Sequence, residues 1–133
     1  MAIVAVKGVN KTYRQGPVAV HALKDIALSI EEGAFAALAG PSGSGKTTLL
    51  NIIGGLDVPD AGEVRINGSS YRDMSASEMA ELRLKRIGFV FQAYNLLPVL
   101  SAVENVEYVM QLQGVAKTER RERAMAILDE VGL

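Results

Sequence analysis

Residues 38–53, LAGPSGSGKTTLLNII, constrain the fold most, because a loop of small residues here joins an apolar run to an amphipathic one. Within this stretch, residues 40–47 match the pattern G-x-x-x-x-G-K-[ST] without a mismatch. Small residues let the backbone curl until successive N–H groups point at one place, beside the positive end of the following helix. The stretch therefore predicts a phosphate-binding loop between a buried strand and a helix.

Each position of this loop is expected to contact a nucleotide phosphate or its metal ion. The Lys46 ammonium should reach the β- and γ-phosphate oxygens, and the Thr47 hydroxyl is a suitable hard ligand for Mg²⁺. The backbone cradle is assigned to Gly40, Ser42, Gly43, Ser44, Gly45 and Thr48. The alternative is a chance glycine-rich turn before a helix. The apolar run before the loop and the helical spacing after it favour nucleotide binding.

The rest of the chain is typical of an α/β protein. Alternating apolar residues over 2–9 and 25–30 predict strands in the first third. Residues 34–39 and 87–92 are apolar on both faces, which favours buried strands of a parallel core sheet. Helical spacing of apolar residues predicts a helix over 46–56.

Helix starts are indicated by capping residues. Ser75 with Glu78, and Ser101 with Glu104, have the spacing of capping boxes, so a helix is expected after each serine. Thr118 is expected to cap a last helix.

Composition limits the function classes. The chain has 133 residues, a formal charge of −1 and no cysteine, which disfavours a nucleic-acid partner and excludes disulfides and thiolate metal sites. Its longest apolar run, residues 34–39, is far below membrane-spanning length, and no secretory leader is recognisable. We therefore expect a soluble protein that meets a membrane only through a partner.

Beyond the loop, four stretches in matching order resemble the ATP-binding cassette (ABC) family. They are GVNKTYRQGPVAVHALKDIALSIEEGAFAALAG, GPSGSGKTTLLNIIGGL, PDAGEVRINGSSY and IGFVFQAYNLLPVLSAVENV. The resemblance covers essentially the whole chain and is similar in detail to the lipoprotein-release and macrolide-export branch. It implies an α/β P-loop NTPase with an N-terminal antiparallel β subdomain, an incomplete RecA-like parallel core and the start of a helical subdomain.

The resemblance also implies a domain organisation. Residues 1–133 correspond to the N-terminal portion of an ABC ATPase domain. Within it, residues 1–92 match the β subdomain and P-loop core, and residues 93–133 match part of the helical subdomain.

Two further site residues come from the resemblance. Tyr13 matches the aromatic residue that stacks on adenine; its alternative is a strand-end tyrosine packed on the sheet. Gln92 matches the Q-loop glutamine, whose amide oxygen reaches Mg²⁺ or the attacking water; its alternative is a polar residue that merely ends a strand. The implied cofactors are ATP and Mg²⁺, with Lys46 and Gln92 contributing to catalysis.

The family resemblance implies two protein partners. One is an integral membrane permease, similar to FtsX-like permeases, whose coupling helix would dock between Ala93 and Asn105. Exposed Leu96, Leu97 and Leu100 suit such docking, although they could equally fold back into the helical subdomain. The other is a second ATPase subunit that completes the ATP site. The protein would then lie in the cytoplasm, at the inner face of the cell membrane.

Two other polar features are expected to have no ligand. His21 is the only histidine, and without a spaced carboxylate it is interpreted as an exposed turn residue. Residues 117–123, KTERRER, could suggest anion binding, but mixed signs at helical spacing favour a solvated helix face.

The family match also sets an expectation about activity. The sequence ends at ILDEVGL, before the point where an LSGGQ-type signature is expected. It contains no apolar strand ending in Asp-Glu and no later switch histidine. Since ATP hydrolysis of this class depends on positioned water and neutralised charge, these 133 residues alone are expected to bind nucleotide weakly and not to hydrolyse it.

Three functions are compared on this basis. The leading hypothesis is the ATP-binding subunit of an ABC transporter, an ATP hydrolase that powers translocation through the permease. The alternative is a non-hydrolysing nucleotide-binding interaction module. A small-molecule P-loop kinase is less favoured, because the stretch after Gln92 supplies neither an arginine-bearing lid nor an acceptor pocket.

Overall fold

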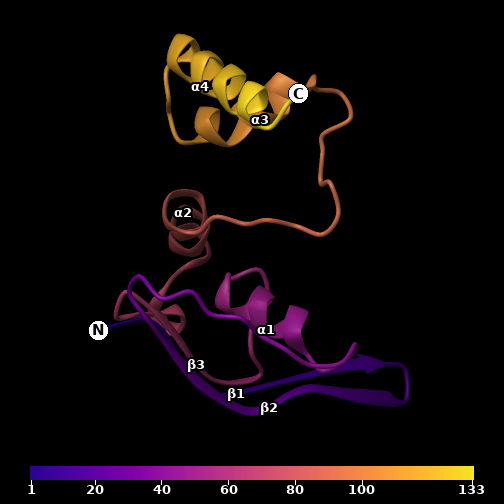
Figure 1. The fold of residues 1–133 in the computed structure, drawn as a ribbon. Coiled ribbons are helices and arrows are strands. Elements are labelled where there is room, and N and C mark those ends of the chain that lie inside the picture. The colour runs from indigo at the N-terminus through magenta and orange to yellow at the C-terminus, as the bar shows by residue number, and fades with distance from the viewer. The chain divides into compact units, whose positions relative to one another are not determined.

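The computed structural model describes residues 1–133, which divide into two compact units, Met1–Ala80 and Glu81–Leu133. The first unit holds β1 (Ala2–Gln15), β2 (Val18–Glu31), α1 (Lys46–Ile53), β3 (Ala61–Ile66), β4 (Ser69–Ser70) and the 3₁₀ helix η1 (Tyr71–Asp73). Helix α2 (Ala76–Arg86) spans the division between the units. The second unit holds α3 (Ala102–Leu112) and α4 (Lys117–Glu130) (Figure 1).

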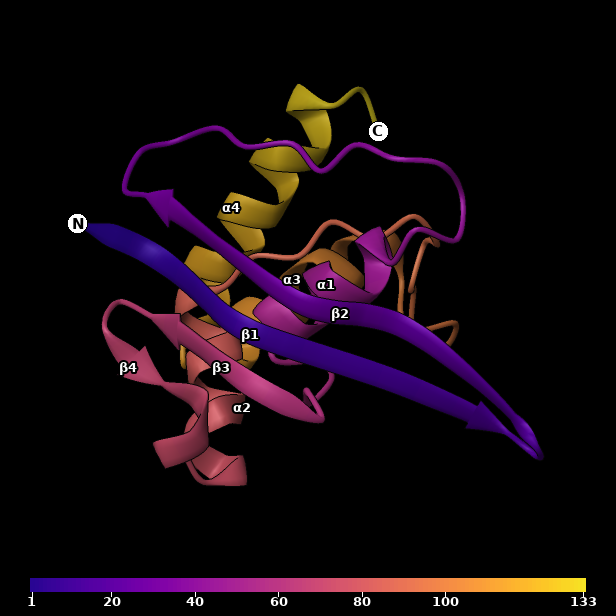
Figure 2. The ribbon, with the colours of Figure 1, turned by 90° about the horizontal axis from the view of Figure 1, so that it is seen from below.

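The first unit contains one antiparallel sheet in the order β2-β1-β3-β4 (Figure 2). The long strand β1 is central, so that Val6 lies opposite Leu28 of β2 on one side and Val64 of β3 on the other. Gly16, with a φ of 59°, occupies the turn between β1 and β2, where a left-handed backbone suits glycine. The antiparallel β subdomain is thus present as expected.

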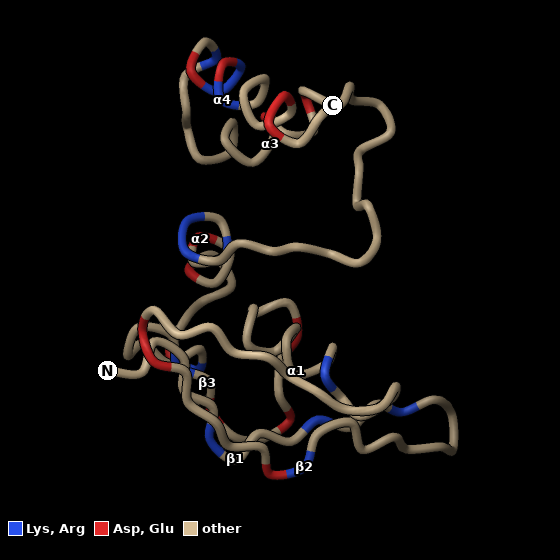
Figure 3. The backbone as a smooth tube through the Cα atoms, in the orientation of Figure 1, with Lys and Arg blue, Asp and Glu red and all other residues tan.

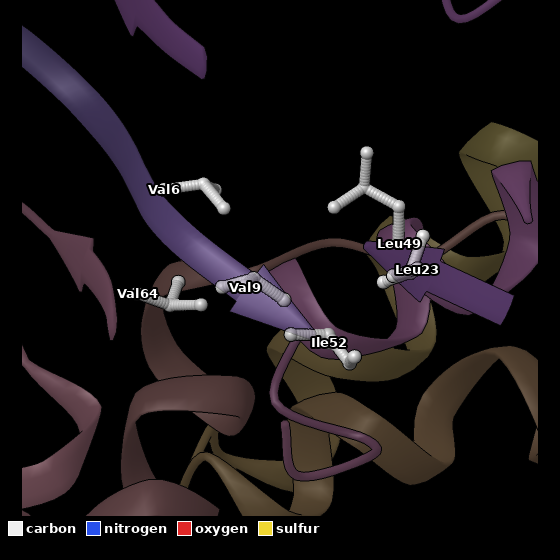
Figure 4. Packing of buried hydrophobic residues seen from close by; sticks show 6 residues of the cluster. All are labelled: Val6, Val9, Leu23, Leu49, Ile52 and Val64. Atoms are coloured by element: carbon white, nitrogen blue, oxygen red, sulfur yellow. The ribbon is translucent and has the colours of Figure 1, made fainter. Parts of the chain in front are cut away.

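The core of this unit is small and lies between the sheet and α1. Leu49 and Ile52, three residues apart on α1, turn toward the sheet and are buried. They form one apolar cluster with strand residues, and Figure 4 shows the six members: Val6, Val9, Leu23, Leu49, Ile52 and Val64. Because α1 packs here, the loop that precedes it is held against the sheet.

The two predicted core strands are not formed. Residues 34–39 and 87–92 are outside every strand, and Phe35 and Val90 are fully exposed. A strand that is apolar on both faces gains stability only when neighbouring strands pair with it and other elements cover it. Neither stretch has a pairing partner among the four strands of the structure, which explains the difference.

Both capping boxes are confirmed. The Ser75 N–H donates to Glu78 Oε2 at 2.7 Å, and the Glu78 N–H donates to Ser75 Oγ at 3.2 Å. Ser101 and Glu104 exchange the same two bonds at the start of α3, with distances of 2.7 and 3.3 Å.

Two other helix ends differ from expectation. Helix α1 ends at Ile53 rather than at residue 56, because Gly54 and Gly55 follow and Gly55 has a φ of 71°. Helix α4 begins one residue before Thr118, so Ala116 is its N-cap residue, and no side chain caps it.

The second unit is held together by contacts between α3 and α4. Ala124 of α4 is buried. Glu107 of α3, only 6% exposed, lies 3.3 Å from Arg121 Nε and 3.9 Å from Arg120 Nε of α4. Positive and negative residues are mixed along α4, as Figure 3 shows. Because Arg120 and Arg121 lie near Glu107, the segment 117–123 is not only the solvated helix face that the sequence predicted.

Candidate functional site

The loop between residues 40 and 45 is curled by glycine. Gly43 and Gly45 have φ values of 78° and 90°, a left-handed conformation that other residues adopt at a cost. The Ser44 N–H donates to the Pro41 carbonyl oxygen at 3.2 Å and closes a tight turn inside the loop. The expected compact loop is therefore present before α1.

The N-terminus of α1 opens onto this loop without a side-chain cap. Gly45 is the N-cap residue, and its carbonyl oxygen accepts the first helical bond from the Leu49 N–H at 2.9 Å. No side chain accepts from the first turn, and no acidic residue lies in it. The positive helix end and its first N–H groups thus face the pocket as an anion-binding arrangement.

The Lys46 ammonium lies over the loop. Its Nζ donates to the carbonyl oxygens of Gly40 and Pro41 at 2.6 and 2.7 Å, and to Ser44 Oγ at 3.2 Å. These three oxygens hold a positive charge beside the helix N-terminus. The loop therefore presents a fixed cation and backbone donors together, which is the chemistry that a polyphosphate requires.

A pocket of about 590 Å³ lies at this place, a volume typical of small-molecule sites. Eight of the residues predicted for the site line it: Tyr13, Ser42, Gly43, Ser44, Gly45, Lys46, Thr47 and Thr48. Gly40 contributes through its carbonyl oxygen, which binds Lys46. The structure thus brings the loop residues together with Tyr13, which is 33 residues away from Lys46 in sequence.

Tyr13 reaches the pocket from β1 and is 39% exposed. Its hydroxyl donates to Asp57 Oδ2 at 2.5 Å. This hydrogen bond raises the pKa of Tyr13, and burial adds to the rise; the same bond lowers the pKa of the Asp57 carboxyl group. The ring is therefore anchored at its hydroxyl end while part of its surface remains open.

Sequence reasoning missed four residues around the pocket. Val20, His21 and Ala22 line it from β2, because the β1–β2 hairpin folds back so that Tyr13 lies opposite Val20. A prediction of the β1–β2 pairing would have placed these three β2 residues next to Tyr13. Asp57 could not be found this way, since its contact with β1 joins residues 44 positions apart and depends on the path taken after α1.

The prediction that His21 is an exposed turn residue is wrong about the turn. His21 is exposed, as expected, but it lies within strand β2 opposite Thr12 rather than in a turn. Its Nδ1 and the Thr12 hydroxyl are joined by a hydrogen bond of 3.0 Å. Strand β1 ends at Gln15 and β2 begins at Val18, so the turn between them lies before His21.

Gln92 belongs to the second unit. It is exposed and follows a stretch without strand structure, so the prediction that it ends a core strand is wrong. Its expected contact with Mg²⁺ or water stays a prediction.

A metal ion at this site would be bound mainly by the phosphate groups of a nucleotide rather than by protein side chains. The chain has no group of three histidine, cysteine or acidic side chains placed to bind a metal. Thr47 lines the pocket, and one hydroxyl together with phosphate oxygens is a set of ligands that Mg²⁺ accepts. The residues present therefore fit Mg²⁺ carried by a nucleotide.

The segment between Ala93 and Asn105 is held in shape by Asn105. Its side-chain amide donates to the carbonyl oxygens of Leu97, Leu100 and Ser101 at 3.2, 3.2 and 2.9 Å, and its Oδ1 accepts from the Leu97 N–H at 2.8 Å. Leu96 and Leu97 are exposed, whereas Leu100 is half-buried.

Comparison with known protein families agrees with the P-loop fold. The family model described as ABC transporter matches residues 23–133. The chain belongs to the ABC transporter family. None of its helices has the length and apolar character needed to span a membrane.

Individual relatives point to one branch of this family. The ABC transporter ATP-binding protein MJ0796 of Methanocaldococcus jannaschii is 46% identical over 129 residues, which are 95% of this chain and 55% of that protein. The macrolide export ATP-binding/permease protein MacB of Aggregatibacter actinomycetemcomitans is 44% identical over 133 residues, which are 100% of this chain and 21% of that protein. The chain thus spans about half of one relative and about a fifth of the other.

Solved structures confirm the fold. The dimeric post-hydrolysis state of MJ0796 bound to ADP and Pi matches with a TM-score of 0.88 at 46% identity, over 95% of this chain and 56% of that one. A second dimeric structure of MJ0796 matches with a TM-score of 0.89 at 45% identity. The predicted fold class, the P-loop fold of an ABC ATP-binding domain, is therefore confirmed.

Proposed function

We propose that this chain binds the phosphates of Mg-ATP as part of the ATP-binding domain of an ABC transporter. One observation carries the proposal: the Lys46 ammonium and an uncapped helix N-terminus lie together in a pocket that also contains Tyr13. The loop donors would bind the phosphates, and the Tyr13 ring would stack on the base. The solved structure of MJ0796 with ADP and Pi supports a nucleotide as the ligand.

Within this proposal, each residue has a separate task. The Lys46 ammonium would replace its hydrogen bonds to the loop oxygens with hydrogen bonds to β- and γ-phosphate oxygens, and Thr47 would bind Mg²⁺. Gln92 would reach the metal ion or the attacking water when the ATP site is closed. Residues 1–92 would supply the β subdomain and P-loop core, and residues 93–133 would supply part of the helical subdomain.

The whole protein would use ATP hydrolysis to move a substrate through a permease at the inner face of the cell membrane. Relatives named as macrolide export ATP-binding/permease proteins support a permease partner, and the dimeric structures of MJ0796 support a second ATP-binding subunit. The segment between Ala93 and Asn105 would meet the permease, since Leu96 and Leu97 are exposed there.

Hydrolysis would not be carried out by these 133 residues on their own. They contain no buried strand that ends in Asp-Glu, and no carboxylate lines the pocket next to Lys46. Without a general base, phosphoryl transfer lacks the positioned water that it requires. A steady-state phosphate-release assay on the chain is expected to show no turnover above the rate of the Lys46→Ala variant.

Nucleotide binding is tested by titrating fluorescent mant-ATP with and without Mg²⁺. Lys46→Ala is expected to weaken binding about 10- to 100-fold, since charge-assisted hydrogen bonds to phosphate are lost. Lys24→Ala is the matched control, because this exposed lysine of β2 lies outside the pocket. Equal affinities of Lys46→Ala and the unmodified chain would contradict the assignment of the cradle.

A further inference from the structure

The hydroxyl end of Tyr13 is held by groups that lie outside the phosphate-binding loop. Asp57, four residues after the end of α1, accepts a hydrogen bond of 2.5 Å from the Tyr13 hydroxyl through Oδ2. Its other oxygen, Oδ1, lies 3.2 Å from Lys11 Nζ. Lys11 in turn donates to the Val58 carbonyl oxygen at 2.8 Å. Strand β1 and the connection after α1 are therefore linked at the edge of the nucleotide pocket.

Lys11 also contacts the ring directly. Residues 11 and 13 of one strand point to the same side of the sheet, and Lys11 Nζ lies over the Tyr13 ring, 5.2 Å from its centroid. The Lys11 side chain is only 14% exposed, so it is confined to this place. The cation thus covers one face of the ring, and a base in the pocket would have to stack on the opposite face.

We propose that Asp57 and Lys11 are positioning residues for the nucleotide base: they fix the Tyr13 ring so that its free face is presented to a planar base in the pocket. This inference rests on the proposed nucleotide binding. It assigns Asp57 and Lys11 no contact with the phosphates, because neither residue lines the pocket.

The connection after α1 links the position of the Tyr13 ring to that of the phosphate-binding loop. Helix α1 carries the loop at its N-terminus, and Asp57 follows its C-terminus. Anchoring Tyr13 to Asp57 therefore fixes the distance between the base platform and the phosphate cradle through one short helix. A ring without this anchor would sample several orientations, and a bound base would have to select one of them at a cost in affinity.

The experiment compares a ligand with a base and a ligand without one. Binding of ATP and of inorganic tripolyphosphate is measured by competition against mant-ATP for the chain, Asp57→Ala and Asp57→Asn. We expect Asp57→Ala to weaken ATP binding about 3- to 10-fold, a part of the contribution of base stacking, and to leave tripolyphosphate within about twofold. Asp57→Asn keeps an acceptor oxygen and should recover most of the affinity for ATP.

Two further variants separate positioning from a structural effect. Tyr13→Phe keeps the ring and removes the donor, so Asp57→Ala should cost little more in a Tyr13→Phe background. Glu32→Ala is the matched control, because the exposed carboxylate of Glu32 lies outside the pocket and contacts neither Tyr13, Asp57 nor Lys11, whereas Asp60 lies 3.9 Å from Lys11 Nζ. It should leave the ratio of ATP to tripolyphosphate affinity unchanged.

The outcomes distinguish this inference from the proposed function. If the chain binds ATP and Asp57→Ala binds it equally well, the positioning role is wrong while nucleotide binding stands. If Asp57→Ala weakens ATP and tripolyphosphate alike, Asp57 supports the fold rather than the base, and the inference is overturned. If the unmodified chain binds neither ligand, the proposed function itself fails.

Discussion

Gly45 lies against the backbone of Ala22, so closely that a Cβ atom on Gly45 would be 2.4 Å from the Ala22 carbonyl oxygen. This contact joins the last residue of the phosphate-binding loop to strand β2. Ala22 lies between His21 and Leu23, which are both paired with β1, so its backbone oxygen has little freedom to move and the close approach requires glycine. The same glycine has a φ of 90°, and both constraints apply at once.

Gly45→Ala is therefore expected to destabilise the first unit and to open the loop. The left-handed backbone alone costs about 1–2 kcal/mol for alanine, and the steric contact adds to it. The measurement is the free energy of unfolding in urea, followed by circular dichroism. Gly16→Ala is the control, since Gly16 has a φ of 59° and nothing within 4 Å of its Cβ position. Equal destabilisation by the two substitutions would show that the contact with Ala22 is unimportant.

Local signals in the sequence predicted local structure well. The glycine spacing predicted the curled loop, and the serine–glutamate pairs predicted where α2 and α3 begin, because a capping box involves only residues three apart. The burial of Leu49 and Ile52 also follows from helical spacing within one short element.

Features that depend on distant partners could not be predicted in this way. Residues 34–39 have the apolar character of a core strand, but pairing requires a neighbouring strand that no local pattern can supply. The contact between Tyr13 and Asp57 depends on how the chain turns after α1. Thr118 is not the cap, because α4 begins at Lys117 and Ala116 is its N-cap residue, so Thr118 lies inside the helix.

The N-terminus of α4 offers a stabilising substitution. Its N-cap residue, Ala116, has an extended ψ of 145° and provides no side-chain acceptor. Ala116→Ser should place a hydroxyl where it accepts from the first turn and stabilise the second unit by about 0.5–1 kcal/mol. Thermal unfolding monitors the change. Ala126→Ser, an exposed position inside the same helix, is the control and should be neutral or slightly destabilising. A gain that is no greater at residue 116 than at residue 126 would contradict the assignment of the cap.

The buried carboxylate of Glu107 is expected to support the pairing of α3 with α4. Glu107→Gln removes the charge that faces Arg120 and Arg121, and Arg120 is itself largely buried, with 19% of its side chain exposed. We expect a loss of about 1–3 kcal/mol in the free energy of unfolding, because a partly buried cation is left without its partner. Glu122→Gln, at an exposed position of α4, carries the same charge change and should stay within about 0.5 kcal/mol. Similar effects of the two variants would mean that the buried pair contributes nothing specific.

The capping box of α3 should make the second unit sensitive to acid. The pKa of Glu104 is lowered because its carboxylate accepts a hydrogen bond from the Ser101 backbone N–H and, secondarily, interacts with the Ser101 hydroxyl. A carboxyl group whose pKa is lower in the folded state contributes stability that is fully present above its unfolded pKa of about 4.3. That contribution is lost as the pH falls through the lower folded pKa, since protonation removes the charged acceptor.

Glu104→Gln tests this pH dependence, because the amide oxygen still accepts a hydrogen bond but does not titrate. The unmodified chain should lose helical signal more steeply than Glu104→Gln between about pH 5 and pH 2, and the two should differ least in slope near neutral pH. Circular dichroism during an acid titration measures both curves. Glu130→Gln, at the exposed end of α4, is the control and should retain the acid sensitivity of the unmodified chain. If Glu104→Gln instead follows the same acid curve as that control, the Ser101 capping box does not contribute to the pH dependence of folding.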